Sequence, residues 1–112
     1  MKIDSYRFGR MQIGSNVYTN DLIIYPDRIH KNWIRRSGHL LGKEDITEIL
    51  ELKPDLLIIG TGKFGMMKVP LQLRQMLQIE GITTIAEPTS EAVWQYNCEN
   101  TKNKVAMFHL TC

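Results

Sequence analysis

The chain has 112 residues, the size of one compact domain, and we expect residues 1–112 to fold as a single domain. Hydrophobic residues make up 43% of it and charged residues 23%, and a formal net charge of only +2 gives no general electrostatic argument for a nucleic-acid partner. No apolar run approaches the roughly 20 residues of a membrane-spanning helix, no signal peptide is recognisable, and two cysteines do not form a disulfide framework. The predicted protein has no membrane segment and is cytoplasmic.

The pattern over residues 1–36 predicts a meander of short antiparallel strands. Aromatic and aliphatic residues surround Gly9, which is typical of a strand with a bulge or a tight turn. Turn residues separate the apolar segments that follow. The last of them, residues 30–36 (HKNWIRR), is expected to be a further strand with Trp33 and Ile34 as its apolar residues.

The pattern becomes helical in residues 42–55 (GKEDITEILELKPD). Three apolar residues recur there with the spacing of one helix face, namely Ile46, Ile49 and Leu50. Residues 55–60 (DLLIIG) follow, and four consecutive apolar residues are typical of a strand that is buried on both faces. Such a strand predicts helices on both sides of the sheet.

The remaining sequence alternates between helices and strands. We expect a helix from Pro70 to Gly81, a strand over ITTIA, a helix over TSEAVWQYN with Thr89 or Ser90 as its N-cap, and a strand over KVAMFHLTC that runs to the last residue. The predicted order is a β-meander or hairpin followed by α-β-α-β-α-β. The predicted fold class is α/β, a three-layer sandwich on a mixed central sheet, with the early strands as a hairpin extension.

Residues 58–65 (IIGTGKFG) contain the pattern G-x-G-x-x-G directly after an apolar strand. In dinucleotide-binding folds this pattern opens a helix, and an acid follows about 20 residues later, as Glu87 does here. However, Pro70 puts the helix several residues too late, and the long side chains within residues 63–67 crowd the loop. The chain is also short for two mononucleotide-binding halves, and Phe64 replaces the Ser or Thr of a Walker A loop. We therefore expect no cofactor.

The same loop lies at the carboxyl end of its strand, where α/β folds bind ligands. Glycines let backbone N–H groups point into a cavity, and a lysine adds positive charge, so one interpretation is a pocket for a small anionic ligand. The other interpretation is a glycine-rich turn with a solvated lysine. The residues assigned to the anion pocket are Gly60, Thr61, Gly62, Lys63, Arg36, His39 and His109.

The histidines and cysteines form no pattern typical of a metal or catalytic site. His30, His39 and His109 do not have the spacing of zinc ligands. His109 and Cys112 point to opposite faces of an extended strand, which is a poor geometry for a Cys–His pair. We expect no metal and no catalytic residue. His109 is interpreted as a semi-buried strand residue or, alternatively, as a proton donor in a pocket.

Residues 28–36 are the basic part of the chain. Their cations are Arg28, Lys31, Arg35 and Arg36, with Trp33 between them. One interpretation is a nucleic-acid surface. We favour a solvated strand face with the tryptophan in the core, because no known nucleic-acid motif accompanies the charges.

Several segments resemble one family over nearly the whole chain, namely LLIIGTG, GITT, AVWQYN and FHLTC. The ending His109-Leu110-Thr111-Cys112 resembles the family's His-Ser-Thr-Cys, and the family's A-V-x-x-Y-N is matched by Ala92, Val93, Tyr96 and Asn97. Residues 33–39 resemble its tryptophan-rich strand and Thr-Gly-His-like turn, with Ser37 in place of threonine. This is a family of small uncharacterised α/β domains that includes the adipogenesis-associated Mth-type domain protein and an assembly factor of mitochondrial respiratory complex I.

The resemblance implies a three-layer α/β fold, no established enzyme activity and action through protein partners. The chain looks like a stand-alone prokaryotic member of that family. We therefore predict a non-enzymatic binding or assembly domain with a protein partner, with a homodimer as one form of assembly. One alternative is an enzyme or carrier for a small phosphorylated or carboxylated ligand, and a weaker one is a nucleic-acid-binding module.

Overall fold

The structure is a computed structural model that describes all residues from 1 to 112. Its elements in chain order are β1 (Ser5–Arg7), β2 (Arg10–Ile13), β3 (Asn16–Tyr18), β4 (Leu22–Ile24), β5 (Ile29–Lys31), the 3₁₀ turn η1 (Lys43–Ile46), α1 (Thr47–Leu52), β6 (Leu56–Thr61), α2 (Leu71–Ile79), β7 (Thr83–Glu87), α3 (Thr89–Cys98) and β8 (Lys104–His109).

Five strands form the main sheet, in the order β5-β4-β8-β6-β7. β6 is parallel to both β8 and β7, whereas β4 is antiparallel to β8 and to β5. The parallel strands are connected through α2 and α3, because a parallel pair cannot be joined by a tight turn. The predicted α/β class with a mixed central sheet is confirmed.

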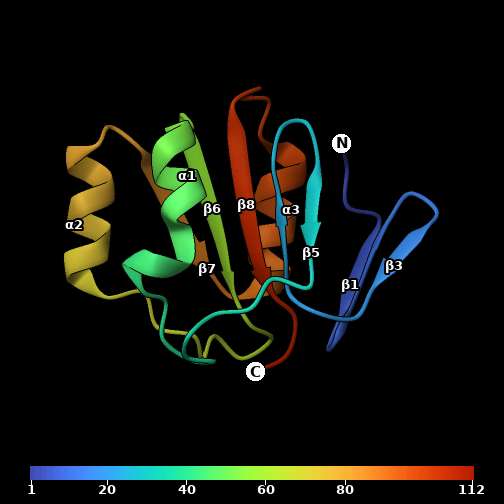
Figure 1. Cartoon of the computed structure of the whole chain (residues 1–112). Coiled ribbons are helices and arrows are strands. Elements are labelled where there is room, and N and C mark those ends of the chain that lie inside the picture. Colours follow the sequence, from blue (N-terminus) through green and yellow to red (C-terminus); the bar gives the residue numbers. More distant parts are fainter.

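The first three strands form a sheet of their own. β2 pairs antiparallel with both β1 and β3, and this small sheet lies on the side of the molecule nearest β5 (Figure 1). The predicted meander therefore divides into two parts, because β4 and β5 join the main sheet instead.

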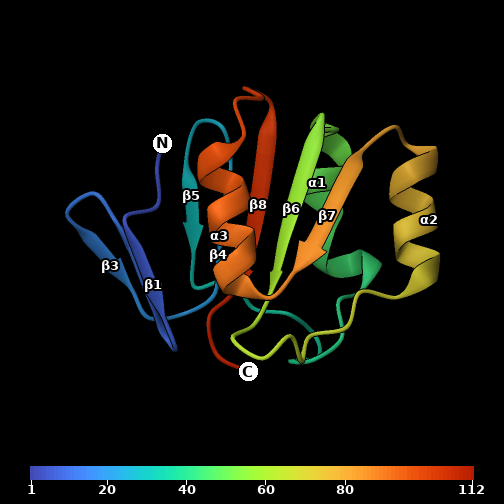
Figure 2. The same ribbon diagram turned by 180° about the vertical axis from the view of Figure 1, so that it is seen from behind.

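Both faces of the main sheet are covered. α1 and α2 lie on one face and α3 on the other, as the two opposite views show (Figures 1 and 2). One cluster of 14 buried residues packs on the α1 and α2 side, and a second of 12 packs on the side of α3 and the small sheet. β6 lies between these two cores and is therefore buried on both faces, which explains its unbroken apolar run.

Residues 30–36 differ from the expected strand. β5 ends at Lys31, because Asn32 adopts a left-handed backbone conformation with φ of 57°, which asparagine tolerates better than most residues. The turn buries Trp33, whereas the side chain of Ile34 is 86% exposed. The strand thus ends before both of the apolar residues that were expected in it.

Thr89 has a role that the sequence did not indicate. α3 begins at Thr89 and has no side-chain cap, so the predicted N-cap is wrong. Thr89 Oγ1 instead donates to the carbonyl of His109 at 2.6 Å and accepts from the N–H of Gly62 at 2.8 Å. The hydroxyl therefore joins the end of β8 to the glycine loop. β8 itself ends at His109, so the last three residues, which were predicted to continue the strand, lie outside it.

Candidate functional site

A buried cluster of charged and polar side chains lies at the carboxyl end of β8. Arg35 Nη1 donates to Asp21 Oδ2 at 2.6 Å, and His109 Nδ1 lies 2.8 Å from the same oxygen. The side chain of Arg35 is 5% exposed and that of His109 is 7% exposed. Charged and polar side chains are seldom so deeply buried without a partner, and the Asp21 carboxylate is the partner of both.

Three elements bring these side chains together. Asp21 immediately precedes β4, which pairs with β8, so its carboxylate reaches the last residues of β8 and accepts from the N–H of Leu110 at 2.8 Å. Arg35 comes from the segment after β5, where its guanidinium lies over the ring of Trp33, 4.8 Å from the ring centroid. Its Nη2 also donates to the carbonyl of Gly38 at 2.9 Å. The cluster thereby holds the segment after β5, which is the edge strand of the main sheet.

The electrostatics of the cluster favour an ionised aspartate. Burial alone would raise the pKa of Asp21, but hydrogen bonds from His109, the Leu110 N–H and Arg35 outweigh it and lower the pKa below its usual value. A carboxylate only accepts hydrogen bonds, so the 2.8 Å contact with Asp21 is a hydrogen bond in the tautomer that carries a proton on Nδ1, whereas Arg35 Nη2, a donor 3.1 Å from the same nitrogen, favours the tautomer without one. The other ring nitrogen, Nε2, bonds to neither group.

Two nitrogens of the cluster have no hydrogen-bond partner in the protein. They are His109 Nε2 and Arg35 Nε, and both are buried. A buried unpaired polar atom is costly, and it calls for a water, an ion or a functional role. Chemically, Nε2 can accept or donate a proton and Arg35 Nε can donate a hydrogen bond to an oxygen. The arrangement therefore suits the binding of a polar ligand or the transfer of a proton better than nucleophilic attack.

The backbone of the glycine loop is bonded within the chain. Of residues 62–68, only Phe64 has an N–H without an acceptor in the protein. The Lys63 N–H donates to the carbonyl of Thr111 at 2.7 Å, and the Met66 N–H donates to that of Cys112 at 2.9 Å. The loop therefore holds the last residues of the chain, and few of its backbone donors are free for an anion.

The structure brings together some of the residues assigned to the anion pocket. The rings of His39 and His109 meet edge to face with their centroids 6.1 Å apart. Gly62 lies against His109, since a Cβ on that glycine would approach the imidazole Cδ2 to 2.8 Å. Gly60 and Thr61 are buried at the end of β6. His39 and Gly62 thus lie against His109, and Thr61 lies beside it on the neighbouring strand.

The other two residues assigned to that pocket lie apart from it. Lys63 is exposed, and its Nζ lies 5.8 Å from the centroid of the Tyr6 ring. Arg36 is also exposed, and its backbone N–H donates to Asp45 Oδ1 at 3.0 Å. The anion pocket thus stays a prediction, with its buried members better placed than its cations.

Sequence reasoning missed Asp21, and it placed Arg35 only in a basic stretch. Asp21 directly precedes the apolar residues of β4, which is the one local signal that was available. The contact with His109 depends on β4 pairing with β8, and the two residues are 88 positions apart in the chain. No local pattern reports such a pairing.

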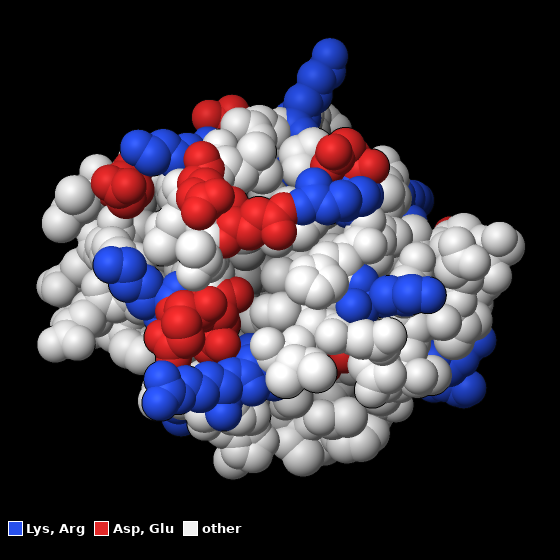
Figure 3. Space-filling model, in the orientation of Figure 1, with Lys and Arg blue, Asp and Glu red and all other residues white.

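Exposed apolar side chains gather near this cluster. We call Phe8, Leu40, Phe64 and Met66 the carboxyl-edge surface, because they lie beyond the carboxyl ends of β6 and β8. All four are exposed, and the rings of Phe8 and Phe64 have centroids 6.3 Å apart. In Figure 3 the lower edge of the molecule, which carries the loop after β6, is mostly white, with basic atoms to its sides and acidic atoms next to those on the left.

Backbone hydrogen bonds join the segments that carry this surface. The Gly9 N–H donates to the carbonyl of Leu110, which ties the β1–β2 turn to the end of β8. The Lys68 N–H donates to the carbonyl of His39, and the Leu41 N–H donates to that of Lys68. The exposed apolar residues therefore stand on a hydrogen-bonded framework.

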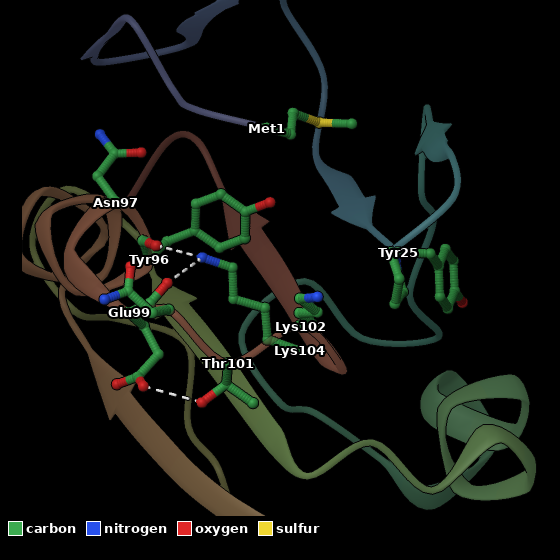
Figure 4. Close-up of a pocket in the computed structure, with 10 residues that line it drawn as sticks. Met1, Tyr25, Tyr96, Asn97, Glu99, Thr101, Lys102 and Lys104 are labelled. Carbon is green, nitrogen blue, oxygen red and sulfur yellow. Dashed lines mark hydrogen bonds between the residues drawn. The ribbon is translucent and has the colours of Figure 1, made fainter.

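A cavity of about 460 Å³ lies at the opposite end of β8 (Figure 4). Lys104 lines it together with Glu99 and Lys102, and its Nζ donates to the carbonyls of Tyr96 at 2.6 Å and Glu99 at 2.7 Å. Burial lowers the pKa of Lys104, while the charge of Glu99 opposes this shift. Since the ammonium is bound to the last carbonyls of α3, its evident role is to close that helix.

Two of the four cations of the basic stretch are paired with acids. Arg28 forms ion pairs with Asp27 and Glu48, and Arg35 is buried against Asp21. Figure 3 shows acidic and basic atoms intermixed over this face of the molecule. These contacts support the structural interpretation of residues 28–36 over a nucleic-acid surface.

No group of three or more His, Cys, Asp or Glu side chains is arranged to hold a metal ion. No helix has both the length and the apolar character needed to cross a membrane.

Comparisons with known proteins agree with the fold. A family model described as "Protein of unknown function (DUF498/DUF598)" matches residues 3–110. The chain is similar to the solved structure of a conserved hypothetical protein from Pyrococcus horikoshii OT3, with 30% identity, a TM-score of 0.81 and full coverage of both chains. It is similar to an outer membrane protein from Bartonella henselae, with 26% identity, a TM-score of 0.80 and coverage of 98% of this chain and 94% of that one.

A further likeness concerns the fold alone. A Bordetella pertussis protein described as a Mth938-like domain is 15% identical, with a TM-score of 0.72 and coverage of 97% of this chain and 85% of that one. At that identity the similarity extends to the arrangement of elements and not to the site.

Proposed function

This chain belongs to the DUF498/DUF598 family of unknown function, as its resemblance to Mth-type domains predicted, and we propose that it is a non-enzymatic binding and assembly domain of the cytoplasm. In this proposal the carboxyl-edge surface is the docking site for a partner protein. The chemical contribution of the domain is to present that surface, and no bond is made or broken.

The observation that carries this proposal is the grouping of exposed apolar side chains on a fixed framework. Phe64 and Phe8 are in contact although both are exposed, and a contiguous apolar patch on a soluble domain marks an interaction site more often than a random surface. Aromatic side chains are also the commonest energetic centres of protein interfaces. A framework that does not reorganise lowers the entropic cost of binding.

Affinity selection from a random-peptide library, followed by calorimetry with the selected peptides, tests this function. Phe64→Asp is expected to weaken binding by about tenfold or more, because it places a charge in the centre of the patch. Trp94→Asp is the matched control, since both aromatic residues are about two-thirds exposed (69% and 64%) and Trp94 lies on α3. Equal binding by the native chain and Phe64→Asp would contradict the proposal.

A homodimer is one form that this assembly can take. Sedimentation equilibrium of the native chain and of Phe64→Asp checks it. A dimer that is lost in the variant supports self-association through the carboxyl-edge surface, and a monomer at all concentrations leaves the partner as a different protein.

The second candidate function is a carrier or enzyme for a small phosphorylated or carboxylated ligand. The two unpaired buried nitrogens of His109 and Arg35 favour it. Thermal unfolding against nucleotides, sugar phosphates and carboxylates tests it, since a ligand at 100 times its Kd adds about 2.7 kcal/mol, a shift of about ten degrees in a domain of this size.

Two variants assign any such shift to a site. A shift that Lys63→Ala removes belongs to the glycine loop. One that survives in Lys63→Ala and is lost in His109→Gln belongs to the buried cluster. If no compound shifts the transition, the anion candidate is wrong.

A further inference from the structure

The two edge strands of the main sheet, β5 and β7, differ in how well they could pair with a further strand. β5 has three residues, ends in Lys31 and is followed by the left-handed Asn32. A short strand with a lysine and a sharp bend is a poor template for further pairing. β7 has five residues, contains no lysine, proline or glycine, and carries a charge only at its last residue, Glu87. The sequence of β7 therefore has few of the features that prevent a strand from being added.

The hydrogen bonds between β7 and β6 leave part of the β7 backbone free. β7 is parallel to β6, and the Thr83 N–H donates to the carbonyl of Asp55 at 3.2 Å. Because alternate residues of a parallel strand bond to the same neighbour, this bond assigns the odd-numbered residues of β7 to β6. Thr84 and Ala86 therefore direct their N–H and carbonyl groups outward, and no turn, loop or helix of the protein bonds to these groups.

α2 stands over this free edge without closing it. In both views α2 is the outermost element and lies beyond β7 (Figures 1 and 2). A cavity of about 460 Å³ lies between the two, lined by Arg74 and Gln78 of α2 and by residues 81–84. Arg74 and Gln78 are four residues apart and share one helix face, whereas α2 packs into the core through Leu73 and Leu77. The space beside the start of β7 is therefore open.

We propose that an extended segment of a partner protein binds in this space as an added edge strand. Its backbone bonds to the outward groups of Thr84 and Ala86, and Arg74 and Gln78 cover one side of it. The partner is therefore a flexible or terminal segment without proline at the residues that face β7. In this recurring mode of peptide recognition the main-chain hydrogen bonds supply the affinity. The inference goes beyond the proposed function, because it concerns a different edge of the molecule from the carboxyl-edge surface.

A second copy of this chain does not fit beside β7. Two β7 strands related by a two-fold axis would lie about 4.8 Å apart. Each copy would bring its own α2 over the same narrow strip, although two packed helices need about 8–10 Å between their axes. Since α2 already lies beyond β7, the two helices would overlap. A single extended segment carries no such helix, and for this reason it is the occupant.

Peptides selected from a random library on the native chain test the inference. Each selected peptide is measured by calorimetry against Ala86→Pro, Lys31→Pro and Phe64→Asp. Proline at position 86 removes an outward N–H and puts a ring in its place, while the bonds between β7 and β6 remain. We expect a group of peptides that bind Ala86→Pro at least tenfold more weakly than the native chain. The same peptides should bind the matched control, Lys31→Pro, and Phe64→Asp with unchanged affinity.

The variants must be folded for this comparison. Thermal unfolding checks them, and Thr84→Pro replaces Ala86→Pro if the latter does not fold, since both positions have outward N–H groups. Hydrogen exchange measured by NMR on the native chain needs no variant. The amides of Thr84 and Ala86 should exchange at least tenfold more slowly with a peptide bound, and that of Lys31 should not change.

Backbone N-methylation of the peptides gives the decisive readout. A methyl group on a peptide nitrogen removes a donor and blocks strand pairing, but only where that nitrogen faces β7. Methylation at alternate residues should therefore abolish binding, and methylation at the residues between them should leave it unchanged. Loss of binding at every methylated position, or at none, would overturn the added strand.

The possible outcomes separate this inference from the proposed function. Peptides that only Ala86→Pro weakens support the added strand, and if no peptide depends on Phe64 the proposed function fails while the inference stands. Peptides that depend only on Phe64 overturn the inference and leave the docking surface standing. Binding that neither substitution affects overturns both.

Discussion

At the scale of single residues, the end of β8 is fixed by polar contacts in a protein that is otherwise held by two apolar cores. Asp21 contacts two side chains and one backbone N–H through its carboxylate oxygens. The Thr89 hydroxyl donates a hydrogen bond to one carbonyl and accepts one from an N–H. Removing one member of a buried network leaves the groups bonded to it without a partner, which is costly. Single substitutions there are therefore expected to have large effects.

Asp21→Asn is expected to lower the free energy of unfolding by about 3 kcal/mol at pH 7, because it leaves Arg35 buried without a counter-charge. The pKa of Asp21 is lowered from 3.8 in the folded protein, so its contribution is present in full above that value and is lost as the pH falls through the lowered pKa. Urea unfolding at pH 7 and pH 3 should show a difference between native and variant that shrinks in acid.

Asp27→Asn is the control for that series. Asp27 pairs with Arg28 at the surface, so its loss is expected to change stability by less than about 0.5 kcal/mol at either pH. A difference for Asp21→Asn that does not depend on pH would contradict the assigned charge.

Gly62→Ala is expected to destabilise the protein by about 3 kcal/mol or more. The backbone there has φ of 107°, and a Cβ would overlap the carbonyl of Cys112 as well as crowd His109. Gly14→Ala isolates the conformational part, since Gly14 has φ of 60° with open space around it and should cost only about 1 kcal/mol. Equal losses in chemical unfolding would show that the close approach at Gly62 does not matter.

At the scale of secondary-structure elements, α3 differs from α2 in how it ends. A lysine from the following strand, Lys104, binds two of its last carbonyls and lies over the Tyr96 ring, 3.9 Å from the ring centroid. The charge is placed where the helix dipole favours a cation. The contact also fixes where β8 starts relative to α3.

Lys104→Met is expected to cost about 1–2 kcal/mol, because it keeps the apolar stem but removes two charge-assisted hydrogen bonds. The amides at the end of α3 should also exchange with solvent faster. Lys102→Met, at an exposed position in the loop just before β8, should leave stability and exchange unchanged. A similar effect of the two substitutions would argue against the helix-closing role.

At the scale of the whole molecule, the burial of the strands is uneven. All residues of β6 are buried, as are all but the first of β8, whereas the strands of the small sheet are partly exposed. Because β6 lies between β8 and β7, its backbone groups are bonded on both sides. The centre of the main sheet should therefore be the last part to open.

Hydrogen exchange followed by mass spectrometry measures this order. Amides in residues 56–61 and 104–109 are expected to exchange at the rate of global unfolding, and those in residues 5–18 are expected to exchange sooner. Equal protection of both regions would mean that the small sheet unfolds together with the main one.

The sequence predicted the fold better than the site, and particular residues show why. The apolar run of β6 and the helical spacing around Ile46 are local signals, and both led to the correct elements. The left-handed conformation of Asn32 ends β5 early, and the presence of an asparagine alone does not predict such a turn. The meeting of Asp21, Arg35 and His109 depends on strand pairing over long sequence distances, which periodicity does not report.

The last residues of the chain have a practical consequence. Cys112 is held by the Met66 N–H, and the two ends of the chain lie on opposite sides of the molecule (Figure 1). A purification tag fused after Cys112 would begin beside Phe64 and Met66 and would cover these side chains. Fusions for interaction screens should therefore be attached ahead of Met1, and a carboxyl-terminal fusion that captures nothing is not a negative result.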